Sequence, residues 1–371
     1  MNAEYNNPFI TGQAVRGNDF FGRKKILSDI SDFLNQDNSQ VNYFVFGQRR
    51  SGKTSLLKTV QDKFKNENLL LLYFNLQDKA EIQLENILSQ IKNRIVKYID
   101  AGENIVNIVD FNQFITQINI ISDRKIVLLF DEFDVMCKHT YRKKDEGKLQ
   151  TSLAPFLSNL TDLIEEKNIS LKFIIATGRN FNHKYKNLCT DFEKKGKSVT
   201  LEGFDYDTVK EIVSLSKEIV FKEEAADKIN EISGGNPYII QAMCHSLYDF
   251  AARHNAKSVT KKMVKKRLKS IVKSFGNGLD SIWADIPTPE KIVLYFSAFI
   301  LENDNKCNKK TIQKEINESN VDFDINLLPE ILINLSQNKF LRKKKLENYT
   351  FKIEFFRKWI IEEIKLNELN K

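Results

Sequence analysis

Cysteine and histidine are scarce in this sequence, and neither is spaced as metal ligands usually are. The four cysteines are far apart and form no CxxC pair; they are Cys137, Cys189, Cys244 and Cys307. The four histidines show no ligand spacing either; they are His139, His183, His245 and His254. Closely spaced pairs of these residues are typical of zinc sites and disulfide frameworks. We therefore expect neither a structural metal nor disulfide bonds.

The sequence also lacks a long hydrophobic run and a secretory signal. No segment approaches the roughly 18 uncharged apolar residues that a bilayer crossing needs. The longest apolar run, residues 69–76, contains Asn75. The N-terminus has no positive region followed by an apolar one, which a secretory signal requires. We therefore expect a soluble, cytoplasmic protein.

Acidic residues are missing from one stretch of the chain. Residues 251–279 contain nine Lys or Arg and no Asp or Glu, and these nine exceed the formal net charge of +8 of the whole chain. The basic character is therefore local. It does not by itself make the whole protein a nucleic-acid binder.

From residue 41 onward, short β-rich runs alternate with longer helical patterns. The runs are residues 41–47, 69–76, 125–134 and 171–177, with a weaker one at 199–204. Such alternation predicts an α/β fold with a parallel five-stranded sheet covered by helices. Since 371 residues exceed the usual domain size, we expect further units.

After Phe204 the strand pattern stops and amphipathic helical patterns follow. We predict an α/β core over residues 1–204, a helical lid over 205–285 and a winged helix over 286–371. The last prediction depends on three helical patterns followed by a short β-like pair.

The segment GQRRSGKTS (residues 47–55) fits the pattern G-x-x-x-x-G-K-[ST] directly between a β run and an amphipathic helix. Glycines let such a loop wrap with its N–H groups pointing inward, and the helix N-terminus adds its dipole to phosphate binding. We expect Lys53 to neutralise the β and γ oxygens of ATP and Thr54 to offer a hydroxyl to Mg²⁺. The predicted phosphate-binding residues are Gly47, Gln48, Arg49, Arg50, Ser51, Gly52, Lys53, Thr54 and Ser55.

A second pattern, KIVLLFDEFD (residues 125–134), is a buried-type strand that ends in carboxylates. Ligands of open α/β sheets bind at the carboxyl ends of the strands. We expect Asp131 to hold Mg²⁺ through water and Glu132 to orient and deprotonate the attacking water. Asp134 either extends this acidic site or begins the next helix, and we favour the helix start.

A third strand, LKFIIATGRN (residues 171–180), also ends in polar residues. Thr177 or Asn180 is a candidate for positioning the lytic water, and Arg179 for stabilising charge on the γ-phosphate. The alternative is a solvated strand end without function.

Together these motifs resemble the STAND branch of AAA+ P-loop ATPases, in its compact bacterial and archaeal form. NPFITGQAVRGNDFFGRKKIL (residues 7–27) is similar to the family segment that wraps the adenine, which implies that Phe21, Gly22 and Arg23 lie near the base. SGGNPYIIQ (residues 233–241) resembles the GxP lid motif, which implies that Pro237 contacts the base side and senses the nucleotide. The resemblance covers nearly the whole chain and implies slow ATP hydrolysis.

Two departures from the family are visible. No arginine stands beside GGNP, where many AAA+ proteins carry a second sensor, so a conventional ring-ATPase mechanism is not expected. No effector or repeat domain is visible in the sequence, so we expect the effector to lie on another chain or to be absent. The expected partners are an unknown protein and further copies of this chain in a nucleotide-dependent homo-oligomer.

The rival hypothesis is a DNA-bound ATPase comparable to replication initiators or transposition helpers. The basic stretch at residues 253–273 favours DNA, although it also fits an ordinary solvated helix face. Against DNA, the expected recognition helix at 325–338 has no Lys or Arg, which leaves only asparagines and Gln337 as readers. Lys343, Lys344 and Lys345 in the expected wing offer nonspecific phosphate contacts at most.

An aromatic and aliphatic face follows the expected wing and consists of Phe355, Phe356, Trp359 and Ile360. Most of it should close the winged-helix core. We expect the remainder to dock on the ATPase core in the ADP state, so that the C-terminal segment acts as a brake.

Overall fold

The computed structural model describes residues 6–36, 42–77, 84–135, 171–178, 196–303 and 305–369. The chain divides into two compact units. The sheet unit consists of residues 14–48 and 52–201, and the helical unit of residues 1–13, 49–51 and 202–371. The predicted boundary between lid and winged helix stays a prediction.

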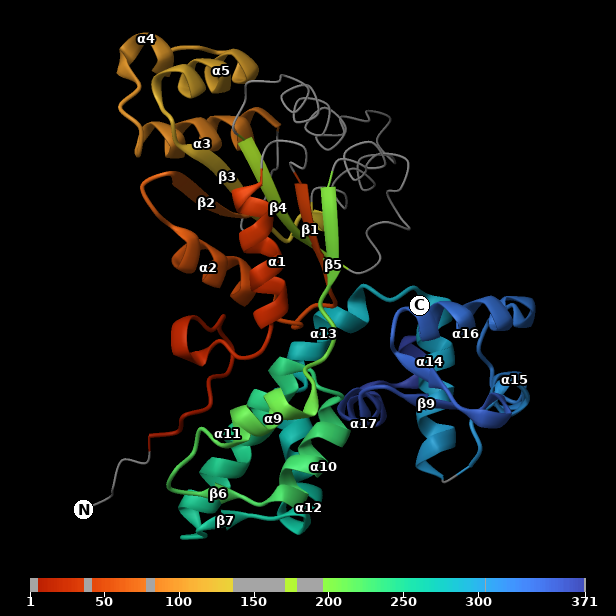
Figure 1. Cartoon of the computed structure of the whole chain (residues 1–371). Helices are drawn as coiled ribbons and strands as arrows, with labels where there is room; N and C mark the ends of the chain where they lie inside the picture. Colours follow the sequence, from red (N-terminus) through yellow and green to blue (C-terminus); the bar gives the residue numbers. More distant parts are fainter. Residues whose placement is uncertain are drawn as a thin grey trace. The chain divides into compact units, whose positions relative to one another are not determined.

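The sheet unit is built on five parallel strands in the order β2-β3-β4-β1-β5 (Figure 1). They are β1 (Asn42–Phe46), β2 (Leu69–Asn75), β3 (Lys125–Asp131), β4 (Leu171–Thr177) and β5 (Gly196–Thr200). The predicted α/β fold with a parallel five-stranded sheet is thus confirmed. The fifth strand begins three residues earlier than predicted. It lies at the sheet edge, where exposed polar residues weaken the hydrophobic pattern.

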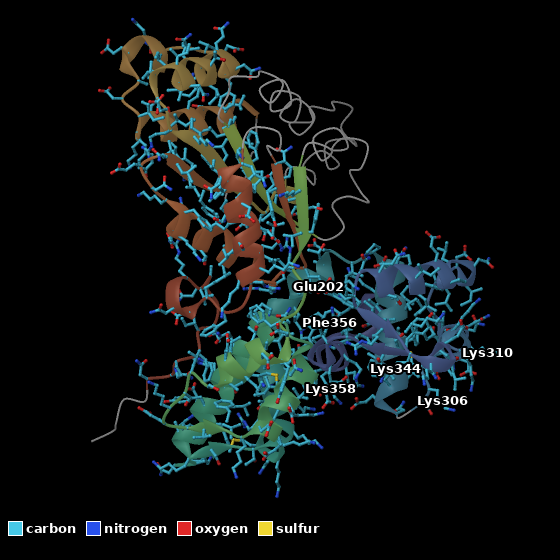
Figure 2. All side chains as sticks on the ribbon, in the orientation of Figure 1. Glu202, Lys306, Lys310, Lys344, Phe356 and Lys358 are labelled. Carbon is cyan, nitrogen blue, oxygen red and sulfur yellow. The ribbon has the colours of Figure 1, made fainter. Side chains whose placement is uncertain are left out.

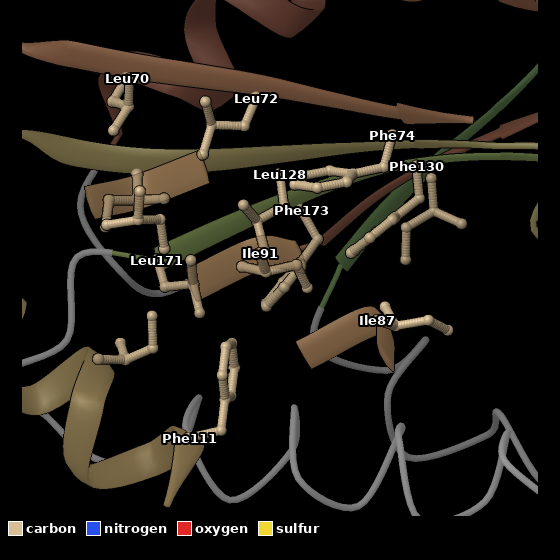
Figure 3. Close-up of a cluster of buried hydrophobic side chains, with 14 of the residues drawn as sticks. Leu70, Leu72, Phe74, Ile87, Ile91, Phe111, Leu128, Phe130, Leu171 and Phe173 are labelled. Atoms are coloured by element: carbon tan, nitrogen blue, oxygen red, sulfur yellow. The ribbon is translucent and has the colours of Figure 1, made fainter. Parts of the chain in front are cut away.

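Helices cover both faces of this sheet because successive strand residues point to opposite sides. One cluster joins Phe44, Leu72 and Phe130 to α3 (Leu84–Val96) and α5 (Phe111–Ile121), as Figure 3 shows for part of it. The short α4 spans Gly102–Val106. The opposite cluster joins the alternate strand residues to α1 (Lys24–Asn35) and α2 (Lys53–Phe64). Burial of each large apolar side chain contributes about 1.5–3 kcal/mol to stability.

A buried lysine connects the sheet to α1. Lys172 on β4 is 1% exposed, and its Nζ donates hydrogen bonds to the carbonyl oxygens of Phe33 (2.6 Å) and Gln36 (2.8 Å). These carbonyls lie at the C-terminus of α1, where helical oxygens have no intrahelical donor and a cation is favourable. The lysine therefore completes the helix end, a role that the apolar pattern of this strand does not predict.

The first part of the helical unit contains five helices and a two-stranded parallel pair. They are α9 (Tyr206–Val213), β6 (Val220–Phe221), α10 (Glu223–Ser233), α11 (Pro237–Arg253), β7 (Ser258–Val259), α12 (Lys261–Phe275) and α13 (Asn277–Ala284). The N-terminal segment belongs to this unit, because the Asn7 amide donates to the Asp249 carboxylate (2.6 Å) and Phe9 packs edge-on against Tyr248.

The second part contains three helices, an antiparallel hairpin and a last helix. They are α14 (Thr288–Glu302), α15 (Lys309–Asn317), α16 (Leu328–Gln337), β8 (Leu341–Lys343), β9 (Tyr349–Phe351) and α17 (Glu354–Glu363). This order agrees with the pattern expected of a winged helix, which remains the interpretation of this segment. Single 3-10 turns lie at Gly17–Asp19, Ile325–Leu327, Lys345–Glu347 and Leu366–Glu368.

The expected docking face on α17 is not available. Its four members, Phe355, Phe356, Trp359 and Ile360, are all at most 4% exposed. Trp359 packs edge-on against Trp283 of α13, in the same unit. The prediction that part of this face remains free to dock is therefore wrong, because the helical unit buries all of it. Among the helices of the described ranges, none is long and apolar enough to cross a bilayer.

Candidate nucleotide-binding site

The predicted phosphate loop connects β1 directly to α2. At its start, the Gly47 amide donates to the carbonyl of Thr177 (3.2 Å), which fixes the loop to the neighbouring strand β4. At its end, Gly52 is the N-cap of α2 and has φ 94°, a left-handed conformation in which other residues are strained. The strand, loop and helix therefore follow one another as phosphate binding requires.

Lys53 is curled back into this loop. Its side chain is 5% exposed, and Nζ donates to the carbonyl oxygens of Gly47 (3.1 Å) and Gln48 (3.1 Å). A buried ammonium group needs such partners, because burying an isolated charge is costly. The loop thus holds one positive charge inside its own curve.

The hydroxyl of Thr177 is buried without a hydrogen-bond partner among the described residues. A buried polar group without a partner costs roughly 1–3 kcal/mol, which a water molecule or a ligand at this strand end would offset. Thr54 is half-buried, whereas Ser55 Oγ accepts a hydrogen bond from the Val15 amide (3.2 Å). The donor set therefore suits phosphate oxygens, and the Thr54 hydroxyl suits a hard cation such as Mg²⁺.

The carboxylate of Asp131 is held by two donors at the end of β3. It is 1% exposed, and it accepts hydrogen bonds from the Tyr73 hydroxyl (2.8 Å) and from the Glu132 amide (3.0 Å). Tyr73 was not among the predicted site residues. Its polar tip within the otherwise apolar run LLLLYFN was the available signal.

Glu132 follows in a left-handed conformation, with φ 53°. This conformation is uncommon for a residue with a side chain, and such strain is concentrated at functional sites. The next amide, that of Phe133, donates to the Ala176 carbonyl (3.1 Å) and so anchors the turn to β4. Asp134 already has helical conformation, in agreement with the favoured helix start.

The strand order brings these groups together at the carboxyl ends of the central strands. β4 lies between β1 and β3, with Phe46 paired to Thr177 and Phe130 to Ile175. The phosphate loop, Asp131 and Thr177 consequently end at the same side of three adjacent strands. Arg179 and Asn180 lie outside the described residues.

The residues expected near the base belong to different units. Phe21, Gly22 and Arg23 are half-buried in the sheet unit, and Arg23 is the N-cap of α1. Pro237 is the first residue of α11 in the helical unit, where the Asn236 side chain caps the helix by accepting from the Ile239 amide (3.2 Å). Their contacts with the nucleotide stay predictions.

Comparison with known proteins decides the family. Residues 20–243 match the family described as "ATPase domain predominantly from Archaea". The chain belongs to this family. The match covers both the predicted phosphate loop and the acidic strand end, whose roles in nucleotide binding stay predictions.

Individual relatives agree with this assignment. An uncharacterized ATP-binding protein of Pyrococcus abyssi is 25% identical, over 61% of this chain and 73% of its own. The Holliday junction branch migration complex subunit RuvB of Mycoplasmopsis synoviae is 24% identical, over 68% and 71%. The solved structure of a Walker-type ATPase of Pyrococcus abyssi has TM-score 0.63 and 14% identity, and covers 95% of this chain and 99% of its own. The last likeness concerns the fold alone.

Proposed function

We propose that this chain is a cytoplasmic ATP-driven switch of the STAND kind, which binds ATP or ADP with Mg²⁺, hydrolyses ATP slowly and controls a partner protein. The ATPase part of this proposal rests on one observation. The phosphate loop, Asp131 and Glu132 all lie at the carboxyl ends of the central strands. The packing around the lid turn supports the switch part, as described below.

Each site residue has a distinct role in this proposal. The loop amides and Lys53 bind the phosphates, and Thr54 and Asp131 hold Mg²⁺, which when bound neutralises phosphate charge. Glu132 orients the attacking water and takes its proton. Thr177 positions the same water, and Arg179 stabilises the charge that develops on the γ-phosphate.

The lid turn of GGNP is packed between two other segments of the helical unit. A Cβ atom on Gly234 would lie 2.6 Å from the Lys352 carbonyl oxygen, and one on Gly235 would lie 2.3 Å from the Phe204 carbonyl oxygen. The Phe204 amide donates to the Gly235 carbonyl (2.7 Å). The Lys352 ammonium forms an ion pair with Glu202 (2.9 Å; Glu202 is labelled in Figure 2). The turn therefore has no room for a side chain at either glycine and lies directly against both neighbouring segments.

A second connection runs from the lid to the α12–α13 junction. The Tyr238 hydroxyl, next to Pro237, donates to the Phe275 carbonyl (2.8 Å), and burial raises the pKa of Tyr238. A Cβ atom on the next residue, Gly276, would lie 2.5 Å from Trp359 of α17, so a nucleotide that moves Pro237 would act on residues 286–371 as well. In this proposal the C-terminal segment restrains the lid and slows turnover.

The Glu202–Lys352 pair allows a test that does not delete residues. Glu202→Lys places like charges together and should raise basal ATP turnover a few-fold, whereas the double variant Glu202→Lys with Lys352→Glu restores opposite charges and should return toward wild type. Lys358→Glu, on α17 but paired with Glu302, is the matched control. Equal turnover in all four proteins, each folded by circular dichroism, would refute the brake.

A second candidate is a DNA-bound ATPase, favoured by the basic stretch at 253–273 and by the 24% identity to a Holliday junction branch migration subunit. Stimulation of ATP turnover by duplex DNA tests it. Nucleotide-dependent self-association, compared by light scattering with ATP and ADP, tests the proposed homo-oligomer.

A further inference from the structure

The exposed face of α12 consists almost entirely of lysines. Six lysines of this helix are exposed: Lys261, Lys262, Lys265, Lys266, Lys269 and Lys273. At 100° and 1.5 Å per residue they occupy an arc of about 140° over a length of about 18 Å. The opposite face packs into the unit through Val264 and Ile271, both fully buried.

Few of these lysines form ion pairs with acidic residues in the described part of the chain. Within the part of the chain that the structure describes, one of the six, Lys269, forms an ion pair, with Glu362 at 3.1 Å. Arg267 differs from them, because its guanidinium lies 4.6 Å from the ring centre of Phe250 and it is only half-exposed. The lysine face is therefore a row of nearly uncompensated charge.

The positive charges of these lysines destabilise helix α12. Lys261 and Lys262 occupy the first turn, which contains no acidic residue, at the positive end of the helix dipole. A cation there is unfavourable by about 0.3–1 kcal/mol. Like charges four residues apart, such as Lys261 with Lys265, are destabilising by about 0.2–0.5 kcal/mol per pair. Folding alone gives no reason for this arrangement, whereas an anionic partner would.

We propose that the α12 lysine face binds the phosphate backbone of duplex DNA independently of sequence. The inference goes beyond the ATP-driven switch and does not require nucleotide. It also gives the second candidate a specific surface, distinct from the lysine-free helix α16 that a winged helix would be expected to insert.

The composition of the face decides among anionic partners. Protein interfaces have apolar or aromatic centres and are depleted in lysine, whereas phosphate contacts need only cations. Single strands are bound by aromatic platforms, and no residue of the exposed α12 face is aromatic. The major groove of B-form DNA, about 12 Å wide, admits a helix whose charges reach the phosphates on both rims, while the narrow A-form groove of RNA does not.

The test measures anisotropy of a labelled 30-base-pair DNA duplex across a salt series, with full-length protein. In the test variant, Lys261, Lys262, Lys265 and Lys266 are all changed to Gln. In the control, four exposed lysines of the C-terminal segment are changed to Gln: Lys306, Lys310, Lys344 and Lys345 (three are labelled in Figure 2). Each lost phosphate contact should reduce the slope of log K against log salt by about 0.9, hence by about 3.6 for the test variant.

Further measurements separate this inference from a merely structural role and from the ATPase proposal. The test variant should melt at or above the wild-type temperature in low salt, because the four replaced lysines no longer repel one another. Lys53→Ala should retain wild-type DNA affinity without nucleotide, so failure of the ATP site leaves this result intact. A control that loses as much affinity as the test variant overturns the proposal. So does tighter binding to duplex RNA, or binding to polyglutamate and not to DNA.

Discussion

The first turns of α2 and α12 both contain lysine at the helix end that prefers anions, but this lysine is buried in α2 and exposed in α12. In α2, Lys53 is buried and bound by two carbonyls of its own loop. In α12, Lys261 and Lys262 are exposed, and the helix is capped by Thr260, whose hydroxyl accepts from the Met263 amide (3.3 Å). The first turn of α2 therefore fixes one buried ammonium group, whereas the first turn of α12 exposes two lysines to solvent.

The two proposals assign these turns to two kinds of anion recognition. A closed loop with inward amides and one fixed ammonium suits a single, well-placed phosphate chain. A row of exposed ammonium groups along one helix face suits a repeating anion, because each group contributes the same weak, salt-sensitive contact. The following predictions test this contrast, from the largest expected effect to the smallest.

Lys53→Ala should abolish nucleotide binding, because the variant loses the buried charge that neutralises the phosphates. A hydrogen bond to a charged group contributes about 1.5–3 kcal/mol, and the loop carbonyls would also lose their donor. Calorimetric titration with MgATP and MgADP measures the effect. Lys63→Ala, an exposed lysine at the other end of α2, should bind normally. Unchanged affinity in the Lys53 variant would contradict the site assignment.

Glu132→Gln should bind ATP with wild-type affinity and lose about 100-fold or more of its turnover, since the general base is removed. Single-turnover hydrolysis measured beside equilibrium binding separates the two effects. Wild-type turnover in this variant would exclude Glu132 as the base and leave the phosphate loop assignment standing.

The local placement of the candidate site residues could be predicted from the sequence, whereas their roles in binding stay predictions. The loop between β1 and α2 and the carboxylate at the end of β3 are short-range features that need only neighbouring residues. The prediction was less complete where distant segments meet. Tyr73 on β2 donates to Asp131 on the neighbouring strand β3, and Lys172 completes a helix more than 130 residues away in sequence. The aromatic face of α17 was predicted to be partly free because periodicity cannot show which element covers it.

Tyr73→Phe should weaken Mg²⁺-dependent turnover by about 5–10-fold, because one donor that orients the buried Asp131 carboxylate is lost. A Mg²⁺ titration of ATP turnover should show a raised half-saturation point. Tyr98→Phe, at a half-exposed position away from β3, should match wild type. An identical Mg²⁺ dependence in both variants would mean that Tyr73 is only a packing residue.

Lys261→Glu should raise the stability of the protein by about 0.3–1 kcal/mol in low salt, because an acid replaces a cation at the positive end of a helix dipole. Thermal melting at low and high salt measures this, and the gain should shrink as salt screens the dipole. Lys273→Glu, in the last turn of the same helix, should show no such gain from the dipole. A drop in melting temperature for Lys261→Glu would remove the stability argument for the lysine face.

The strand order also has a consequence for synthesis of the protein. β1, which begins the phosphate loop, pairs with β4 and β5 and with no strand made before residue 171. A nascent chain that has reached residue 170 therefore contains the whole loop sequence but no neighbour to hold its strand, and α1 still lacks the Lys172 donor at its end. Nearly half of the chain must therefore leave the ribosome before β4 can join β1 to β3. Until then the apolar residues of these two strands lack the strand that lies between them.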